Sequence, residues 1–185
     1  LYFWVGDYGN TLTYSRKVLE RHPLVSGNEY IEMVQSEYVS KGEVIFKGCT
    51  LPSSSTRIGV STANNSIKSR PVSRRFADLF PEKENDVRFS LSFNRKRECV
   101  KSRQMSIRSS ELQLMIAEAL YHTGDEVGAL AAINELRAKR ITGVVPYTME
   151  TLPAVNEAEY IKVDVTGKEL TPLINAILNE RRKEL

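Results

Sequence analysis

The chain has 185 residues, of which 41% are hydrophobic and 26% are charged, and its formal net charge at pH 7 is +3. These values are typical of one globular domain, or part of a larger one, with a buried core. The charge is too small to require an anionic partner by itself, and no run of about 18 apolar residues predicts a transmembrane helix.

Helices are expected at the start of the chain. A Gly-Asp turn at residues 6–7 precedes an amphipathic helix that Asn10 or Thr11 caps and that ends near His22. A shorter helix is expected over residues 30–38. The first 40 residues are therefore interpreted as repeat helices.

The next 67 residues, 41–107, are interpreted as an insertion of strands and loops. The β-branched and aromatic residues of EVIFKG (43–48) predict a strand. Residues 49–70 are rich in Ser, Thr and Asn and lack periodicity, which is typical of a long functional loop. A helix is expected from Pro71 to Phe80. Alternating apolar residues over 86–97 predict a second strand, which ends in three consecutive basic residues.

Positive charge is concentrated between Arg57 and Arg108, where thirteen Lys or Arg residues accompany five Asp or Glu residues. A solvated basic face explains this excess most simply. An anionic ligand, a partner protein and nucleic acid are the alternatives. Stacking of bases would require exposed Phe89 and Phe93, but the alternating pattern predicts that both are buried.

Residues 108–185 are interpreted as a helical carboxy-terminal part. Ser109 or Ser110 starts a helix, and Gly124 ends it. One apolar face of this helix is expected to consist of Leu112, Met115, Ile116 and Ala119. Asp125 begins a second helix, and Thr171 caps a last one after an irregular segment. The whole chain is expected to be a single, mainly α domain portion.

The Gly-Asp turn occurs twice. GDYGNTL (6–12) and GDEVGAL (124–130) share the Gly, the Asp and a Leu five residues after the Asp. Each turn follows an aromatic helix end and opens a second helix, which is the arrangement in tetratricopeptide-type repeats. We therefore expect tetratricopeptide-like helix pairs interrupted by an irregular insertion with short strands.

Five motifs follow one another in the carboxy-terminal part of the chain. They are Glu111, an Ala-Glu-Ala segment at 117–119, a Gly-Asp turn at 124–125, Ile-Asn-Glu-Leu-Arg-Ala at 133–138 and Glu-Arg-Arg-Lys-Glu at 180–184. This combination, in this order, resembles the carboxy-terminal part of the SusD/RagB family. The chain opens as if in the last turn of a helix and stops within another. We therefore expect it to be a carboxy-terminal portion of such a protein.

The resemblance implies a non-catalytic protein, without a cofactor, that binds an oligosaccharide or other nutrient at the cell surface. It also implies an outer-membrane lipoprotein of a polysaccharide uptake system, attached through a lipid anchor outside this chain. The implied partner is a SusC-like TonB-dependent transporter. Nucleic acid and metal ions are not expected partners.

The resemblance also implies that binding loops emerge near the insertion. The candidate ligand-binding residues are Tyr38, Arg57, Asn64, Asn65 and Arg70. Asn and Arg side chains can bind sugar hydroxyls, but residues 49–70 contain no aromatic platform for a sugar ring. The only Trp, Trp4, is expected to pack at a helix end.

Carboxylates that could serve catalysis have a simpler structural explanation. Glu111 and Glu118 share one helix face, while Glu180 and Arg181 lie on another helix. Ion pairs between these helices are therefore favoured over the carboxylate pair of a glycosidase.

The histidines and cysteines do not form a recognisable metal site in the sequence. His22 and His122 both lie near helix ends, where the helix dipole favours a cation. Cys49 and Cys99 form no CxxC pair, so a structural zinc site is not expected, and a single disulfide between them stays open.

Two other functions are considered. A tetratricopeptide-like adaptor that binds a peptide or protein partner would show regular repeats of about 34 residues, which the insertion contradicts. An enzyme acting on glycans would need two carboxylates in a cleft, and the sequence does not identify such a pair.

Overall fold

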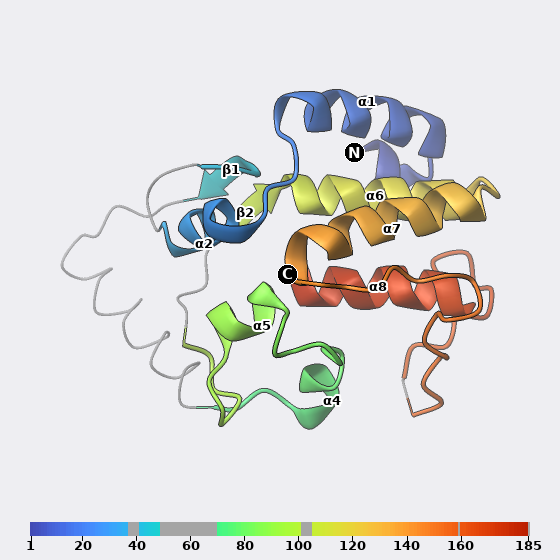
Figure 1. Ribbon diagram of the computed structural model, residues 1–185. Helices are drawn as coiled ribbons and strands as arrows, with labels where there is room; N and C mark the ends of the chain where they lie inside the picture. Colours follow the sequence, from blue (N-terminus) through green and yellow to red (C-terminus); the bar gives the residue numbers. More distant parts are fainter. Residues whose placement is uncertain (37–40, 49–69, 101–104, 159, 185) are drawn as a thin grey trace, which may run out of the picture.

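The computed structural model describes residues 1–36, 41–48, 70–100, 105–158 and 160–184, and it is mainly helical. The short strands form one two-stranded sheet (Figure 1). The elements, in chain order, are η1 (Tyr2–Val5), α1 (Tyr8–Arg21), α2 (Gly27–Gln35), β1 (Val44–Gly48), α4 (Arg74–Ala77), α5 (Val87–Ser92), β2 (Met105–Arg108), α6 (Ser109–His122), α7 (Glu126–Arg140) and α8 (Pro172–Glu184).

Four long helices form the body of the molecule. In Figure 1, α1, α6, α7 and α8 follow one another from top to bottom, and α6 packs against the other three. Leu114 and Ala117 of α6 are completely buried although they lie outside the expected apolar face. The expectation of one apolar face was wrong, because α6 is covered by neighbouring helices on several sides.

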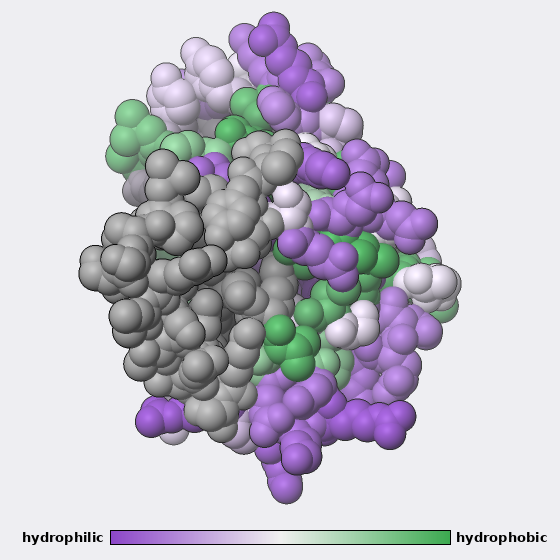
Figure 2. All heavy atoms as spheres, turned by 90° about the vertical axis from the view of Figure 1, so that its left-hand side faces the viewer, coloured by the Kyte–Doolittle hydropathy of each residue, from purple (hydrophilic) through white to green (hydrophobic). Residues whose placement is uncertain are grey.

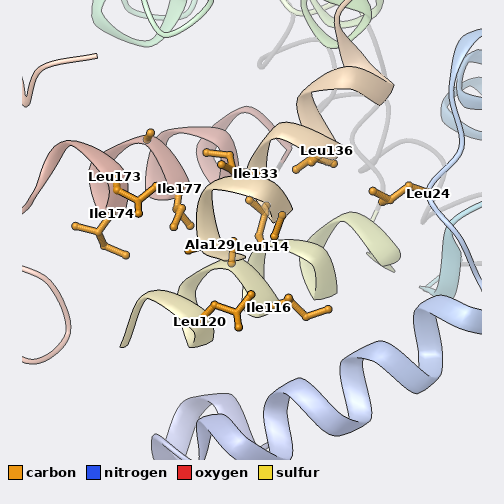
Figure 3. Close-up of a cluster of buried hydrophobic side chains, with 13 residues drawn as sticks. Leu24, Leu114, Ile116, Leu120, Ala129, Ile133, Leu136, Leu173, Ile174 and Ile177 are labelled. Atoms are coloured by element: carbon orange, nitrogen blue, oxygen red, sulfur yellow. The ribbon is translucent and has the colours of Figure 1, made fainter. Parts of the chain in front are cut away.

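The main hydrophobic core lies between α6, α7 and α8. Figure 3 shows Leu114, Ile133 and Ile177, one from each helix, pointing toward a common interior, and none of the three is exposed. Leu24, which follows α1, extends this core. The buried face of α1 contains the small residues Thr11 and Ser15, which let α1 approach α6 closely.

The two Gly-Asp turns share one backbone geometry, as the comparison of the two segments predicts. Gly6 and Gly124 both adopt positive φ, 75° and 87°. In each turn the Gly N–H donates to the carbonyl three residues back, and the Asp N–H donates to the carbonyl five residues back. Only a residue without Cβ adopts this conformation at no cost, which explains the repeated Gly.

The cap of α1 differs from the expectation. Asp7, rather than Asn10 or Thr11, is the N-cap, and its side chain accepts a hydrogen bond from the Asn10 N–H at 3.1 Å. Asp125 caps α7 in the same way, accepting from the Gly128 N–H at 2.8 Å. Both helices therefore begin on the Asp of the repeated turn.

A second, smaller core lies beside the long helices. Tyr30 and Met33 of α2 are buried together with Val44 of β1, and Val87 and Leu91 of α5 pack against them. The strand expected at 43–48 is confirmed as β1, which pairs antiparallel with β2. This pairing joins the segment after α2 to the start of α6.

The strand expected over 86–97 is a helix instead. Asp86 caps α5 by accepting from the Arg88 N–H at 3.0 Å. The alternating apolar residues form two pairs at i, i+4 spacing. Val87 pairs with Leu91, and Phe89 pairs with Phe93, which is the C-cap of α5. A short helix that buries two sides therefore produces the same alternation as a strand.

Two further helices, α2 before the insertion and α4 within it, differ in extent from the expectation. The helix expected at 30–38 is confirmed, but α2 spans Gly27–Gln35. The helix expected from Pro71 to Phe80 is shorter, because α4 begins only after its Ser73 cap and covers four residues. None of the helices in the described ranges is long and apolar enough to cross a membrane.

We expect two Gly→Ala changes in the repeated segments to have different effects on the free energy of unfolding. Gly124→Ala should lower the free energy of unfolding by about 1–2 kcal/mol, because Gly124 has φ 87° and a Cβ there meets no neighbour that could compensate. Gly9→Ala should be neutral or stabilising by up to about 1 kcal/mol, because Gly9 is helical and its Cβ would lie 3.9 Å from Asp7. Urea unfolding of both variants checks this, and equal effects would contradict it.

Candidate ligand-binding cleft

An open cleft of about 900 Å³ lies against α4 and α5. The chain enters it from α4, continues through the turn before α5 and leaves it after α5. Its lining residues are Arg74, Ala77, Asp78, Phe80, Pro81, Lys83, Glu84, Phe89, Ser90, Phe93, Asn94, Arg95 and Arg97.

Packed phenylalanines form the base of the cleft. The ring centroid of Phe89 lies 5.3 Å from that of Phe80 and 5.5 Å from that of Phe93. Phe76 contacts Phe80 and Phe93 from the side, at 5.7 and 5.9 Å. Phe80 is buried, whereas Phe89 and Phe93 are half-buried and keep part of their surface in the cleft. The base is therefore apolar and aromatic.

Charged and polar side chains surround this aromatic base. Arg74, Lys83 and Arg95 are exposed, as are the carboxylates Asp78 and Glu84. Figure 2 shows the face on the left of Figure 1: hydrophobic atoms gather in its middle, and its lowest part is mostly hydrophilic. An apolar base with a polar rim suits a ligand that has both apolar and hydroxyl-rich surfaces.

One wall of the cleft is a tight hairpin after α5. Phe93 pairs with Cys99, and the Asn94 N–H donates to the Glu98 carbonyl at 3.1 Å. The Asn94 side chain accepts from the backbone N–H groups of Lys96 and Glu98. These bonds hold the basic cluster 95–97 in a defined turn, so that Arg95 and Arg97 line the cleft.

A buried ion cluster attaches α5, and with it the cleft, to the long helices. The Arg88 guanidinium binds Asp86 at 2.6 Å and Glu180 of α8 at 2.7 Å. It also lies 3.3 Å from Glu184 of the same helix. Arg88 is only 3% exposed. Removing a charge from water this completely is tolerated only when partners surround it, so Arg88 dictates how α5 sits on α8.

Arg140 connects the same cluster to the smaller core. Its Nε donates to Glu184 at 2.7 Å, and its Nη2 contacts both carboxylate oxygens of Glu43 at 2.7 and 2.8 Å. Its Nη1 donates to the Val25 carbonyl, and its guanidinium lies 4.2 Å from the centre of the Tyr30 ring. Arg140 therefore ties α7 and α8 to α2 and to the start of β1.

Charges of the two signs balance in this cluster. The cations are Arg88, Arg108, Arg137, Arg140 and Lys183, and the carboxylates are Glu43, Glu82, Asp86, Glu180 and Glu184. Burial by itself would raise the pKa of the Glu184 carboxyl, but Arg140, Arg108 and Arg88 lower it to about 2. Glu184 is therefore a carboxylate at neutral pH.

The structure describes only one of the sequence-predicted binding residues. Tyr38, Arg57, Asn64 and Asn65 lie outside the described residues. Arg70 is exposed and precedes Pro71, which pairs with Glu98 of the cleft hairpin. Arg70 does not line the cleft. These five residues stay a prediction.

The cleft residues were not identified from the sequence as a ligand site. The aromatic surface of the cleft comes from the half-buried rings of Phe89 and Phe93, which pack on the buried Phe80. Phe76 with Phe80, and Phe89 with Phe93, stand at i, i+4 spacing, a signal of helical packing that the alternating pattern of 86–97 concealed. Both Phe89 and Phe93 were expected to be buried, and they are half-buried.

Carboxylates of α6 are paired across helices, as expected. Glu111 and Glu118 both form ion pairs with Arg181 of α8, the former at 3.4 Å. Burial raises the pKa of the Glu111 carboxyl, and the Glu118 charge adds to this, while Arg181 opposes it. His122 stacks on Tyr8 with ring centroids 5.0 Å apart. These contacts join α8, α6 and α1 rather than forming a reaction centre.

Trp4 is exposed, and Cys99 is buried. Trp4 was expected to pack, and although its ring touches Phe3 edge-on, 76% of the residue is exposed. It lies in a short 3-10 helix that buries no residue. Cys99 is buried, whereas Cys49 lies outside the described residues, so the structure does not test a disulfide between them. Within the described ranges no group of metal-ligating residues occurs.

The chain matches one known protein family along almost its whole length. The model of the SusD family, SusD_RagB, matches residues 2–185. The chain belongs to the SusD family. This family is one of nutrient- and glycan-binding proteins associated with the outer membrane, and its members are generally not catalytic. No curated protein and no solved structure shows a significant match to the chain.

The motifs that resemble the SusD family are structural in this SusD-family chain. Asn134 holds Tyr147 through two hydrogen bonds, to its carbonyl at 2.8 Å and from its N–H at 2.9 Å. Tyr147 then lies over the Arg137 guanidinium, 3.5 Å from its ring centre. Glu180 and Glu184 belong to the buried ion cluster. The motifs therefore build the framework that carries the cleft.

The ion cluster predicts that the protein loses stability in acid. Glu184 has a pKa of about 2 in the folded chain against 4.5 for an ordinary Glu, so its contribution to the free energy of unfolding is complete above about pH 4.5. As pH falls from 4.5 toward 2, the unfolded chain binds a proton and the folded chain does not. A loss on the order of 3 kcal/mol is expected from Glu184. Urea unfolding at several pH values measures it.

Glu184→Gln isolates this contribution. The variant should lose about 3–5 kcal/mol at pH 7, because Arg140, Arg88 and Arg108 lose a shared anionic partner. Its stability should also depend less on pH between 4.5 and 2. Glu20→Gln, at an exposed position of α1, is the matched control and should change stability by less than about 0.5 kcal/mol. An unchanged acid slope in Glu184→Gln would contradict the assignment.

Proposed function

We propose that the protein captures an oligosaccharide or related nutrient at the cell surface without a chemical reaction, and delivers it to a SusC-like TonB-dependent transporter. In this proposal a lipid anchor outside this chain holds it at the outer membrane. The match of the SusD family over residues 2–185 is the observation that carries the proposal.

The cleft supports capture of a sugar. Its base exposes part of the Phe89 and Phe93 rings, which offer an apolar surface to the C–H faces of a sugar ring. Around this base, Ser90 and Asn94 supply neutral polar groups, and the charged rim supplies further hydrogen-bonding groups. The cleft is open to solvent, as capture of a chain-like ligand requires.

The placement of the carboxylates supports binding rather than hydrolysis. Glu180 and Glu184 are buried among cations, and Glu111 and Glu118 share Arg181. The cleft carboxylates Asp78 and Glu84 are exposed, whereas the general acid of a glycosidase lies in apolar surroundings.

Calorimetric titration with a panel of neutral and acidic oligosaccharides tests the proposal. We expect saturable heat with one class of sugar and no new product by chromatography. Appearance of shorter sugars would contradict the proposal, and silence across the panel would remove its support. Co-purification of the protein with a TonB-dependent transporter from detergent-solubilised outer membranes tests the partnership.

Two aromatic variants locate the sugar site. Phe93→Leu keeps an apolar side chain of similar volume but removes a ring from the cleft, and it should weaken binding by up to about tenfold. Trp4→Leu removes an exposed aromatic residue outside the cleft and should leave affinity unchanged. The reverse pattern would place the sugar on the surface around Trp4.

A further inference from the structure

We propose that the cleft between α4 and the hairpin 93–99 selects an anionic ligand, namely the carboxylate or sulfate groups of an acidic oligosaccharide. The inference rests on the proposed function and names the class of sugar that the protein captures. Four basic residues and two acidic residues line the cleft; they are Arg74, Lys83, Arg95, Arg97, Asp78 and Glu84.

The cations of the cleft differ from the other arginines packed into the fold. Arg88 and Arg140 each contact two or more carboxylates. Among the residues that the structure describes, no carboxylate lies within ion-pair distance of Arg74, Arg95 or Arg97. The buried cluster is electrically balanced, and the cleft beside it carries an uncompensated positive charge. An anion that enters the cleft can therefore bind these cations without first breaking an ion pair with a described carboxylate.

The backbone of Arg97 gives an independent indication. Its φ is 64°, and it is the only residue other than Gly with positive φ in the described part of the chain. A hairpin turn of this kind is usually completed by Gly or Asn at that position, because a side chain costs roughly 1–2 kcal/mol there. Strained residues of this kind concentrate at functional sites.

The Arg97 guanidinium has more N–H donors than its hydrogen bond to Val72 uses. One guanidinium nitrogen, Nη1, donates to the Val72 carbonyl, which fixes the direction of the side chain. A guanidinium has five N–H donors in one plane, so the others are available to a ligand. A held guanidinium that forms no ion pair with any residue the structure describes is suited to bidentate binding of a carboxylate or sulfate group.

The aromatic base narrows the anion to an acidic sugar. The half-buried rings of Phe89 and Phe93 lie in the same cleft as Arg95 and Arg97. A small inorganic anion would use the cations and leave the rings without a partner. An acidic sugar residue has both a charged group and an apolar ring face, so it uses the whole cleft.

Calorimetry with an oligogalacturonate and its fully methyl-esterified form tests the inference, because esterification keeps the sugar chain but removes its negative charges. We expect the acid to bind at least tenfold more tightly than the ester, and the difference to shrink at high salt. A sulfated oligosaccharide distinguishes a site for anionic sugars in general from one for carboxylates. A single-stranded DNA oligonucleotide of equal charge should bind more weakly than the acidic sugar.

Three variants connect the selectivity to the cleft. Arg97→Gly removes the guanidinium and suits φ 64°, so the chain should stay folded while affinity for the acid falls about tenfold. Arg95→Gln should weaken the acid similarly and leave the ester unchanged. Arg16→Gln removes the same charge from an exposed position of α1 and should have little effect.

Each other outcome counts against the inference. Equal binding of acid and ester overturns it but leaves the proposed capture of sugars in place. Binding of DNA as tight as that of the acidic sugar overturns it, as does an Arg16→Gln effect equal to that of Arg95→Gln. If neither the acid, the ester nor any neutral sugar binds, both this inference and the proposed function fail.

Discussion

The contact between Arg88 and the carboxylates of α8 is the constraint on which the arrangement of this molecule depends. The guanidinium is almost completely removed from water and lies 2.7 Å from Glu180. A buried charge of this kind is stable only in one geometry, because any displacement leaves it without a partner at a cost of several kcal/mol. The short helix α5 has six residues; Val87 and Leu91 pack it against the smaller core, and this ion pair fixes its position on α8.

The same cluster explains how a helical framework carries a less regular region. Arg140 reaches Glu43 and the Val25 carbonyl on one side and Glu184 on the other. A buried ion pair is costly to break, so these contacts hold the two regions in one relative orientation. The cleft lies on the outer side of α5, next to this balanced cluster. Its own cations are left unpaired by the described carboxylates, and this contrast is the basis for assigning it an anionic ligand.

The sequence predicted the long helices well because each has a strong local signal. The Gly-Asp turns, with Asp caps and positive-φ glycines, mark the same structure twice. The region 86–97 was predicted wrongly because Val87, Phe89, Leu91 and Phe93 satisfy the period of a strand and of a two-sided short helix equally. Local pattern could not distinguish them, since the deciding contact is that of Arg88 with residues more than ninety positions later, Glu180 among them.

The sequence by itself determined the family, the helical framework and the pairing of α6 carboxylates with α8, because these follow from ordered motifs and from helical spacing. Only the tertiary structure decided where a ligand can enter. Phe80 precedes α5, Phe89 and Phe93 come from α5 and its cap, and Arg95 and Arg97 come from the following hairpin. No local signal marks these residues as neighbours, because their positions depend on buried charges that α7 and α8 contribute.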